Sequence, residues 1–376
     1  RLDLNSSIQH TRTDRLRAPL IRDRAIPILL ATYKAHTGRY AAGGDEASDG
    51  LNFQNLSKRD PKMRVIRQAL KPPAGYAVVA CDSSQVEARM LAWEAGQNDL
   101  VQQFAEGRDP YAEMASKIFG ATAKAIHDGA KNNDDPNHDK FKMQRNVGKT
   151  CILSAGYSVG SKKFSDTLLR SGVRLHDDLG KHEDEARRAH TIYRQSNPAI
   201  VNFWKVCNTV IMELHQNHTQ GDHFRFGGPK QDLFVSGWDN VPGTDKLTAF
   251  IRLPNGYRIW YPDLRQGEDG NLVYYRPKAL KPPRAYGGSV CENVTQALAF
   301  HMLAWQACKM REAAADWPDG LPLVCNIHDA WIAVVPEDRA EACKARMEHC
   351  MSAVPSWLTG FPVGCEAEIG HDFTIA

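Results

Sequence analysis

The clearest strand in the hydrophobic pattern covers residues 76–82 (Y-A-V-V-A-C-D), shortly after the break at Pro72-Pro73. A short, continuous apolar run of this kind is typical of a strand that is buried on both faces. Apolar residues then recur at helical spacing from Val86, and Ser84-Gln85-Val86-Glu87 fits the capping box that begins many helices. The pattern therefore predicts a buried strand followed at once by a helix.

Helical spacing of apolar residues also covers residues 141–160, 183–216 and 292–313. Residues 218–288 differ, because apolar runs there flank Asn255-Gly256, which is a strong hairpin signal, and Asp269-Gly270 predicts a second turn. This segment is expected to form an inserted β-rich subdomain.

Residues 127–140 are rich in Asn, Asp and Pro and are predicted to form an exposed loop between helices. The two histidines in this stretch could suggest a metal site, but a solvated loop is the simpler interpretation.

Two apolar runs, residues 323–327 and 331–335, flank the polar pair His328-Asp329. The pattern predicts a buried hairpin with a carboxylate at its tip. Asp82 also ends an apolar strand, and an unpaired carboxylate is costly where it is desolvated. A turn cap or an arginine partner would explain either aspartate alone, but two converging carboxylates repel each other unless cations neutralise them. The pair is therefore a candidate site for two Mg²⁺ ions, as in many phosphoryl-transfer enzymes.

A basic segment supplies the complementary charge. Its main residues recur every four positions: Arg145, Lys149, Leu153 and Tyr157. On a helix such residues drift slowly across one face. A solvated arginine and lysine one turn apart are common, but Gly148 inside the segment, and Gly156 and Gly160 near its end, are costly in a helix. The glycines favour a functional helix that another group approaches closely.

Composition limits the function without identifying it. The chain has 376 residues, of which 42% are hydrophobic and 24% charged, so it is neither disordered, collagen-like nor a disulfide scaffold. Its length allows two or three domains. No stretch approaches the about 18 uninterrupted apolar residues of a membrane span. The net charge of +3 is too balanced to indicate a nucleic-acid binder, so any basic surface has to be local. Nine cysteines without a C-x-x-C pair indicate a reducing compartment.

Taken in order, the motifs resemble those of family A DNA polymerases, the group of bacterial DNA polymerase I and many phage replicative enzymes. Residues 81–89 (C-D-S-S-Q-V-E-A-R) are similar to motif A, usually D-Y-S-Q-I-E-x-R. The Arg145 to Tyr157 spacing resembles motif B, and residues 326–329 (N-I-H-D) resemble motif C, usually V-H-D-E. Four further similar stretches agree in order, at residues 36–39, 53–56, 104–120 and 292–297. So many matches in the right order make a chance resemblance improbable.

The resemblance covers the chain from residue 36 onward and implies an α+β fold with the right-hand architecture of polymerases. Such a fold has an antiparallel palm sheet and a helical fingers domain, and only a remnant of the thumb would fit here. The β-rich segment suggests the phage-type branch, and no exonuclease domain is expected in this chain. The implied domains are a thumb remnant (1–35), the first part of the palm with motif A (36–100), the fingers with motif B (101–217), the β-rich insertion (218–288) and the second part of the palm with motif C (289–376).

The implied activity is template-directed addition of dNTPs to a primer 3′ hydroxyl by two-metal-ion phosphoryl transfer. By resemblance, Asp82, Asp329 and the backbone carbonyl of Ser83 would hold two Mg²⁺ ions, which Mn²⁺ could replace. Arg145 and Lys149 would bind the triphosphate, and Lys149 would also be a candidate proton donor to the leaving group. The expected partners are primer–template DNA and dNTPs, and no membrane association is expected. The expected location is the cytoplasm of a bacterial or phage-infected cell.

Further residues match family positions that bind the nucleotide or the DNA. Glu87 would exclude a ribose 2′ hydroxyl while packing against Tyr157, although the capping box also explains Glu87 locally. Tyr157 would lie near the templating base, or would simply be a core residue. The other nucleotide-pocket candidates are Leu153, Gln85 and Tyr111. The primer–template candidates are Arg39, Gln54, Asn55, Arg59, Gln296 and His328. The plain alternative is a polar surface position for the loop residues around Gln54 and a hydrogen-bonded core histidine for His328.

Three positions depart from the family pattern. Ser83 replaces the usual Tyr of motif A, Leu153 replaces the Phe or Tyr of motif B, and Ala330 replaces the Glu of motif C. The last change removes an auxiliary carboxylate and bears on metal affinity more than on the reaction. Two other functions stay open. A two-metal nuclease would share the aspartates but would not need the basic helix, and a degenerate polymerase fold could act as a primer–template binding module.

Overall fold

The computed structural model describes residues 30–31, 35–42, 54, 56, 61–277 and 279–375. The chain divides into two units. The first contains Arg1–Val86, Phe300–Ser356 and Val363–Ala376, and the second contains Glu87–Ala299 and Trp357–Pro362. The predicted thumb remnant falls almost entirely outside the described residues, so its structure stays a prediction.

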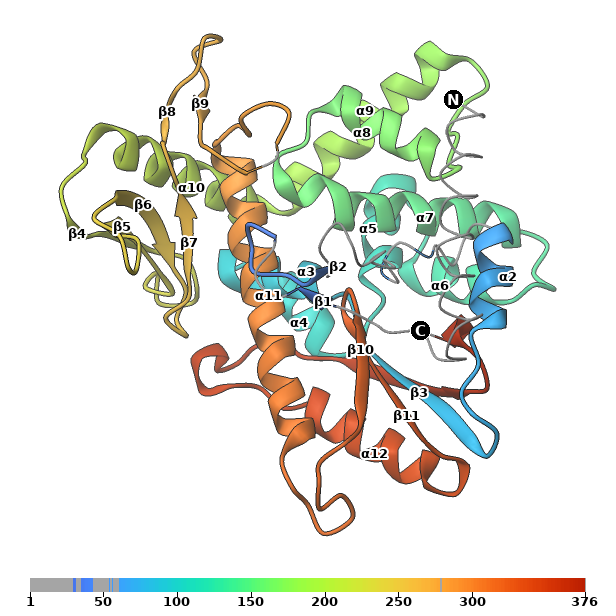
Figure 1. The fold of residues 1–376 in the computed structure, drawn as a ribbon. Helices are drawn as coiled ribbons and strands as arrows, with labels where there is room; N and C mark the ends of the chain where they lie inside the picture. The colour runs from blue at the N-terminus through green and yellow to red at the C-terminus, as the bar shows by residue number, and fades with distance from the viewer. Residues whose placement is uncertain are drawn as a thin grey trace. The chain divides into compact units, whose positions relative to one another are not determined.

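A four-stranded antiparallel sheet organises the first unit, in the order β10-β11-β3-β12. Figure 1 shows the blue strand β3 beside three orange and red strands from the far end of the chain. The bounds are Tyr76–Ser83 for β3, Leu323–Ile327 for β10, Ala330–Pro336 for β11 and Cys365–Gly370 for β12. The predicted strand over residues 76–82 and the predicted hairpin at His328-Asp329 are both confirmed.

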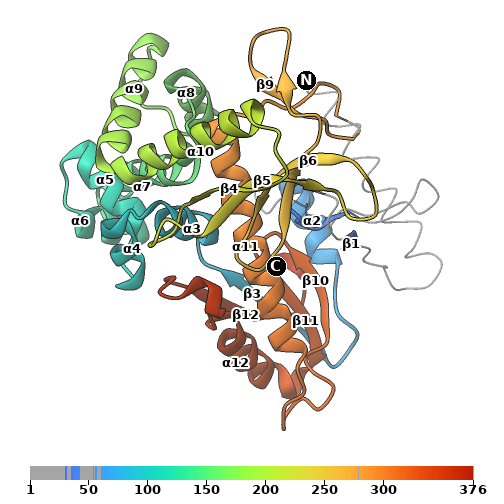
Figure 2. The same ribbon diagram turned by 90° about the vertical axis from the view of Figure 1, so that its left-hand side faces the viewer.

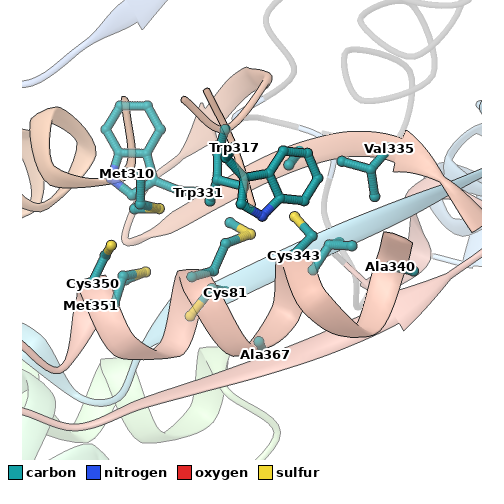
Figure 3. Packing of buried hydrophobic residues seen from close by; sticks show 14 of the residues in the cluster. Cys81, Met310, Trp317, Trp331, Val335, Ala340, Cys343, Cys350, Met351 and Ala367 are labelled. Atoms are coloured by element: carbon teal, nitrogen blue, oxygen red, sulfur yellow. The ribbon is translucent and has the colours of Figure 1, made fainter. Parts of the chain in front are cut away.

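Both faces of β3 are buried, which explains its continuous apolar run, because successive side chains point to opposite faces. Cys81 and its alternate neighbours on one face pack with α12 (Ala340–Met351), as Figure 3 shows, and with the end of α11 (Gly287–Arg311). Val78 and Ala80 on the other face pack against Ile332 and Phe373. The smaller elements of this unit are β1 (Leu30–Ala31), β2 (Ala41–Ala42), α2 (Pro61–Ala69) and the 3₁₀ turns Glu337–Arg339 and Phe373–Ile375.

Helices form most of the second unit. They are α3 (Val86–Ala95), α4 (Asn98–Ala105), α5 (Pro110–Phe119), α6 (Ala123–Lys131), α7 (His138–Ser154), α8 (Ser161–Arg170), α9 (Leu179–Ser196) and α10 (Pro198–Gln216). The loop predicted over residues 127–140 is wrong at both ends, because α6 continues to Lys131 and α7 begins at His138. Thr122 caps α6 and Ile126 is buried, so packing extends the helix into the polar stretch. Only residues 132–137 connect the two helices.

The β-rich part of the second unit is a four-stranded antiparallel sheet in the order β4-β5-β6-β7. The strands are Gly221–Phe226, Phe234–Asn240, Leu247–Arg252 and Arg258–Tyr261. The predicted Asn255-Gly256 hairpin is confirmed, and Gly256 has a φ of +87° that suits glycine. Figure 2 shows α10 with this sheet, to which it is tied by a 3.0 Å hydrogen bond from Trp238 Nε1 to the Leu214 carbonyl. The predicted turn at Asp269-Gly270 joins β8 (Arg265–Gln266) to β9 (Leu272–Val273).

The long helix predicted over residues 292–313 is present as α11, which begins five residues earlier and ends two earlier. Its Gly287–Ala299 part belongs to the second unit and the remainder to the first. Within the described ranges, no helix is long and apolar enough to cross a membrane.

Candidate active site

The register of the first unit's sheet brings Asp82 and Asp329 together. Asp82 is the penultimate residue of β3, and Asp329 lies in the turn between β10 and β11. Asp82 stands opposite Ala330 in the β3–β11 pair, and the Ser83 amide donates a hydrogen bond of 3.0 Å to the Asp329 carbonyl. His328, with a φ of +55°, makes the tight turn that returns the chain into β11. Backbone hydrogen bonding therefore fixes the two aspartates as neighbours.

The expectation that these carboxylates are desolvated is wrong. Asp82 is exposed and Asp329 is half-buried, because both lie beyond the last residues that join the two core clusters. His328 is exposed as well, so it is not a core histidine. The carboxylates are thus open to an ion arriving from solvent.

A further carboxylate stands beside Asp82 that the sequence reasoning missed. Glu366 of β12 is exposed and pairs with Asp82 across the strand, so both side chains point to the same face. The described part of the chain nevertheless contains no group of three or more His, Cys, Asp or Glu side chains that could hold a metal ion. The oxygens of Asp82 and Asp329 are hard donors of the kind that suit Mg²⁺ or Mn²⁺. The alternation C-E-A-E-I-G at residues 365–370 is the signal that could have revealed Glu366.

In the second unit, the predicted basic face of α7 lies against α5. The Arg145 guanidinium carbon is 5.2 Å and the Lys149 Nζ 5.7 Å from the ring centroid of Tyr111, which is buried. The close approach predicted from Gly148 is confirmed: a Cβ added there would meet the Tyr111 carbonyl oxygen. The glycine thus lets the α5 backbone reach α7 and brings both cations over one aromatic ring.

Asp109, which the sequence reasoning did not identify, holds this basic face from the start of α5. Its Oδ2 accepts a 2.6 Å hydrogen bond from Arg145 Nε and lies 2.8 Å from His127 Nδ1. Its Oδ1 caps α5 by accepting from the amides of Tyr111 and Ala112. Burial raises the pKa of Asp109, but the hydrogen bonds from Arg145 and His127 outweigh burial and hold that pKa below its usual value. The available signal was Asp109-Pro110, a helix-start pattern.

The end of motif B differs from the expected continuous helix. α7 ends at Ser154, and Tyr157 lies in the 3₁₀ turn Ala155–Tyr157, so the four-residue spacing does not continue on one helical face to Tyr157. Trp204 of α10 donates a 2.6 Å hydrogen bond from Nε1 to the Gly156 carbonyl and fixes this turn. Leu153, in the last turn of α7, is 42% exposed, which leaves it accessible to a ligand.

Tyr157 and Glu94 are two ionisable side chains of the second unit whose pKa values are raised by burial. Burial raises the pKa of the partly exposed Tyr157 well above its usual value, and the Glu87 carboxylate raises it further. Glu94 lies on α3, seven residues after Glu87. It is fully buried and accepts a hydrogen bond from the Thr295 hydroxyl, and burial raises its pKa as well. The predicted packing of Glu87 against Tyr157 stays a prediction.

The last residue of motif A has a structural task. Arg89 is buried and donates from Nη1 to the carbonyls of Pro362, at 2.9 Å, and Phe104, at 3.3 Å. Its guanidinium carbon also lies 4.7 Å from the Phe104 ring centroid. Arg89 therefore ties α3 to α4 and to the segment 357–362.

The remaining predicted residues come from several segments of the sequence. Gln85 is half-buried with a φ of +50°, between β3 and α3. Arg39 and Gln54 are also half-buried, and the Gln296 amide donates to Glu292 Oε1 at 3.3 Å. Asn55 and Arg59 lie outside the described residues.

Several known proteins are similar to this chain. The family model described as DNA polymerase family A matches residues 8–220, which include Asp82 and Arg145 but not Asp329. A DNA polymerase of Bacillus phage SP02 is 25% identical over 80% of this chain and 41% of its own length. DNA polymerase I of Chloroflexus aurantiacus is 33% identical, covering 89% of this chain and 28% of its own length. The thermostable DNA polymerase I of Thermus aquaticus is 33% identical, with 89% and 31% covered. The chain therefore spans well under half the length of these relatives.

A solved structure shares the fold. It is the POL domain of Pol1 from M. smegmatis in complex with DNA primer-template and dNTP. The TM-score is 0.65 at 16% identity, and the match covers 99% of this chain and 52% of that chain. This match confirms the predicted α+β polymerase fold. Because the family model covers more than half of the residues, including motifs A and B, the chain belongs to DNA polymerase family A.

Proposed function

We propose that this chain carries template-directed DNA polymerase activity, adding dNTPs to a primer 3′ hydroxyl with the help of divalent metal ions. The observation that carries the proposal is the β3–β11 register, which makes Asp82 and Asp329 neighbours at an exposed sheet end. Membership of DNA polymerase family A supports the same reaction. The phage and bacterial relatives support the cytoplasm of a bacterial or phage-infected cell as its place of action.

Asp82, Asp329 and the Ser83 carbonyl are the groups that we expect to hold two Mg²⁺ or Mn²⁺ ions. When bound, such ions lower the pKa of the attacking hydroxyl and neutralise charge on the triphosphate. The positions of the two side chains fit this role, because Asp82 is exposed and Asp329 is half-buried, so both lie at the surface of the sheet end rather than in its core. Ala330 stands directly opposite Asp82, so the carboxylate that this chain lacks would have been its cross-strand neighbour.

The second unit would bind the nucleotide. Arg145 and Lys149 would hold the triphosphate oxygens, with Lys149 as the proton donor to pyrophosphate, and their common ring, Tyr111, would keep both cations on one side of α7. Glu87 and Tyr157 would exclude a ribose 2′ hydroxyl, and Leu153 and Gln85 would complete the pocket. The proposed primer–template contacts are Arg39, Gln54, Asn55, Arg59, Gln296 and His328.

Primer extension with a 5′-labelled primer, a DNA template, dNTPs and Mg²⁺ tests this proposal. Asp82→Asn and Asp329→Asn should each lower the rate of primer extension more than about 100-fold. This is more than the loss of about 10- to 100-fold that follows removal of a residue that only supports a metal ligand. Both should still bind primer–template DNA in an anisotropy titration. Asp338→Asn is the matched control, because Asp338 is an exposed aspartate in the same unit, away from the sheet end. Wild-type rates in either active-site variant would refute the metal assignment.

The same assay separates the alternatives. A chain that binds the DNA but extends it with neither Mg²⁺ nor Mn²⁺ would be a primer–template binding module, as the Ala330 substitution allows. We expect no exonuclease activity in this chain, so a mismatched primer should stay intact without dNTPs. Metal-dependent shortening of the primer that Asp82→Asn abolishes would instead identify a nuclease.

A further inference from the structure

The two carboxylate oxygens of Asp109 have separate tasks. Oδ1 accepts hydrogen bonds from the Tyr111 and Ala112 amides, at 3.0 and 3.3 Å, and so caps α5. Oδ2 accepts from Arg145 Nε at 2.6 Å and lies 2.8 Å from His127 Nδ1. The side chain of Asp109 is only 9% exposed, so these contacts are largely screened from water. One oxygen thus serves the helix, and the other serves the basic face.

The contact with Asp109 restricts the orientation of Arg145 but uses only one of its N–H donors. Asp109 takes only the Nε–H, and the Tyr111 ring lies 5.2 Å from the guanidinium carbon. These two contacts define the direction of the guanidinium, which would otherwise be free to rotate about a long side chain. Among the described residues, Arg145 makes no hydrogen bond through Nη1 or Nη2, and 27% of its side chain is exposed. Its paired Nη donors are the fork that binds phosphate oxygens.

Other charged groups near Asp109 have different partners. Arg108, the preceding residue, pairs with Glu106 at 3.0 Å and Glu113 at 3.2 Å. His127 approaches from α6 on the same oxygen as Arg145, so it steadies the carboxylate on the side opposite the cap. In the described part of the chain, Asp109 is the carboxylate that forms an ion pair with Arg145.

We propose that Asp109 is a positioning residue for nucleotide binding, orienting Arg145 so that its two Nη groups face the triphosphate, with His127 holding the carboxylate in place. This inference rests on the proposed function, since Arg145 is there assigned to the triphosphate. Asp109 itself does not touch the nucleotide. If Asp109 instead competed with the triphosphate for Arg145, removing the carboxylate would tighten nucleotide binding. The positioning role and the competing role therefore predict changes in nucleotide affinity of opposite sign.

The double use of Asp109 allows its tasks to be separated. Asp109→Asn and Asp109→Ser both keep an oxygen that can cap α5, because Asn and Ser are good N-cap residues. In Asp109→Asn an NH₂ group replaces Oδ2. Because this group and the Arg145 Nε–H are both donors, no hydrogen bond forms between them. In Asp109→Ser the side chain is too short to reach Arg145. Asp109→Ala loses both tasks. All three variants lose the ion pair with Arg145, but the Asn and Ser variants should melt higher than the Ala variant, which also loses the cap.

Steady-state extension with dTTP as the varied substrate is the test. In Asp109→Asn and Asp109→Ser the KM for dTTP should rise about tenfold, within the about 100-fold that a 1 Å misplacement costs. The kcat should change by less than the KM, and the Kd for primer–template DNA should stay constant. Glu113→Gln is the control, because Glu113 lies on the same helix and pairs with Arg108 instead. An unchanged or lowered KM in the Asn and Ser variants would overturn the inference.

A double-mutant cycle ties the effect to Arg145. If Asp109 acts through Arg145, then Asp109→Asn should add almost nothing to the KM of Arg145→Ala. An equal rise in both backgrounds would mean that Asp109 acts by another route. If the wild-type chain extends no primer, the proposed function fails by itself. Equilibrium dialysis of labelled dTTP with Mg²⁺ then still decides on Asp109, through the same expected rise in Kd.

Discussion

Replacing Gly148 by Ala should destabilise the chain, although alanine is the better helix former. A Cβ at this position would lie 2.0 Å from the Tyr111 carbonyl oxygen and 3.0 Å from the Ala115 amide nitrogen, both of them backbone atoms of α5. Because real Cβ atoms essentially never approach other atoms within 3.0 Å, the two helices have to separate by about 1 Å at the point of contact.

The magnitude follows from two opposing effects. Overpacking usually costs about 1 to 3 kcal/mol, and the upper end applies where backbone rather than a side chain has to move. Better helix propensity of Ala returns about 1 kcal/mol. We therefore expect the free energy of unfolding to fall by about 2 kcal/mol. The separation of α5 from α7 should also displace Arg145 from Asp109 and raise the KM for dTTP.

Two other glycines provide graded controls. A Cβ at Gly156 would meet the Leu91 Cδ2 at 2.6 Å, which is the end of a side chain that can rotate, and a Cβ at Gly160 would meet nothing within 4 Å. Urea unfolding followed by circular dichroism should rank the losses as Gly148→Ala, then Gly156→Ala, then Gly160→Ala, with the last close to zero. If Gly148→Ala unfolds at the same urea concentration as Gly160→Ala, the rigid approach of α5 to α7 is not a feature of the folded chain.

Two more predictions concern the nucleotide and the pH. Leu153 offers no polar atom to replace the missing 3′ hydroxyl of a dideoxynucleotide, so a hydrogen bond worth about 1 to 3 kcal/mol in a buried site is lost. Leu153→Tyr should therefore raise the incorporation ratio of ddTTP over dTTP by about tenfold or more. Equal ratios in the two proteins would mean that Leu153 does not face the sugar. Burial lowers the pKa of His301 to about 4, against about 6.5 unfolded. Protonation therefore favours the unfolded chain, and as pH falls from 6.5 to 4 the free energy of unfolding should drop by roughly 3 kcal/mol from this residue. His301→Gln should lose that share of the pH dependence in urea titrations at pH 7 and pH 4.5, and an unchanged dependence would refute it.

Elements whose signals are local could be predicted from the sequence. The apolar run that became β3 and the Asn255-Gly256 turn each depend on residues within a few positions, so pattern and turn chemistry were sufficient. Gly148 was informative for a similar reason, since a glycine within a helix indicates close packing whatever the partner is. The sequence could not say that the partner was the backbone of α5.

Contacts between distant positions could not be predicted in the same way. Asp109 meets Arg145 across 36 residues and His127 across 18, and the polar stretch around His127 has the composition of a loop. Burial of Ile126 made that stretch helical and turned His127 toward α5. The exposure of Asp82 was missed because the apolar run before it suggested that the core continued to its end.

The positions of the two aspartates are set by side chains that take no part in the proposed chemistry. Cys81 lies opposite Trp331 on one side and Ala367 on the other, and all three are buried in the cluster over α12. A one-residue slip of β3 would exchange its two faces, so that apolar side chains of the wrong size would face each cluster. The same slip would move Asp82 away from Ala330 and break the hydrogen bond from Ser83 to Asp329. Because packing on both faces forbids the slip, the apolar core of the sheet specifies which carboxylates meet at its end.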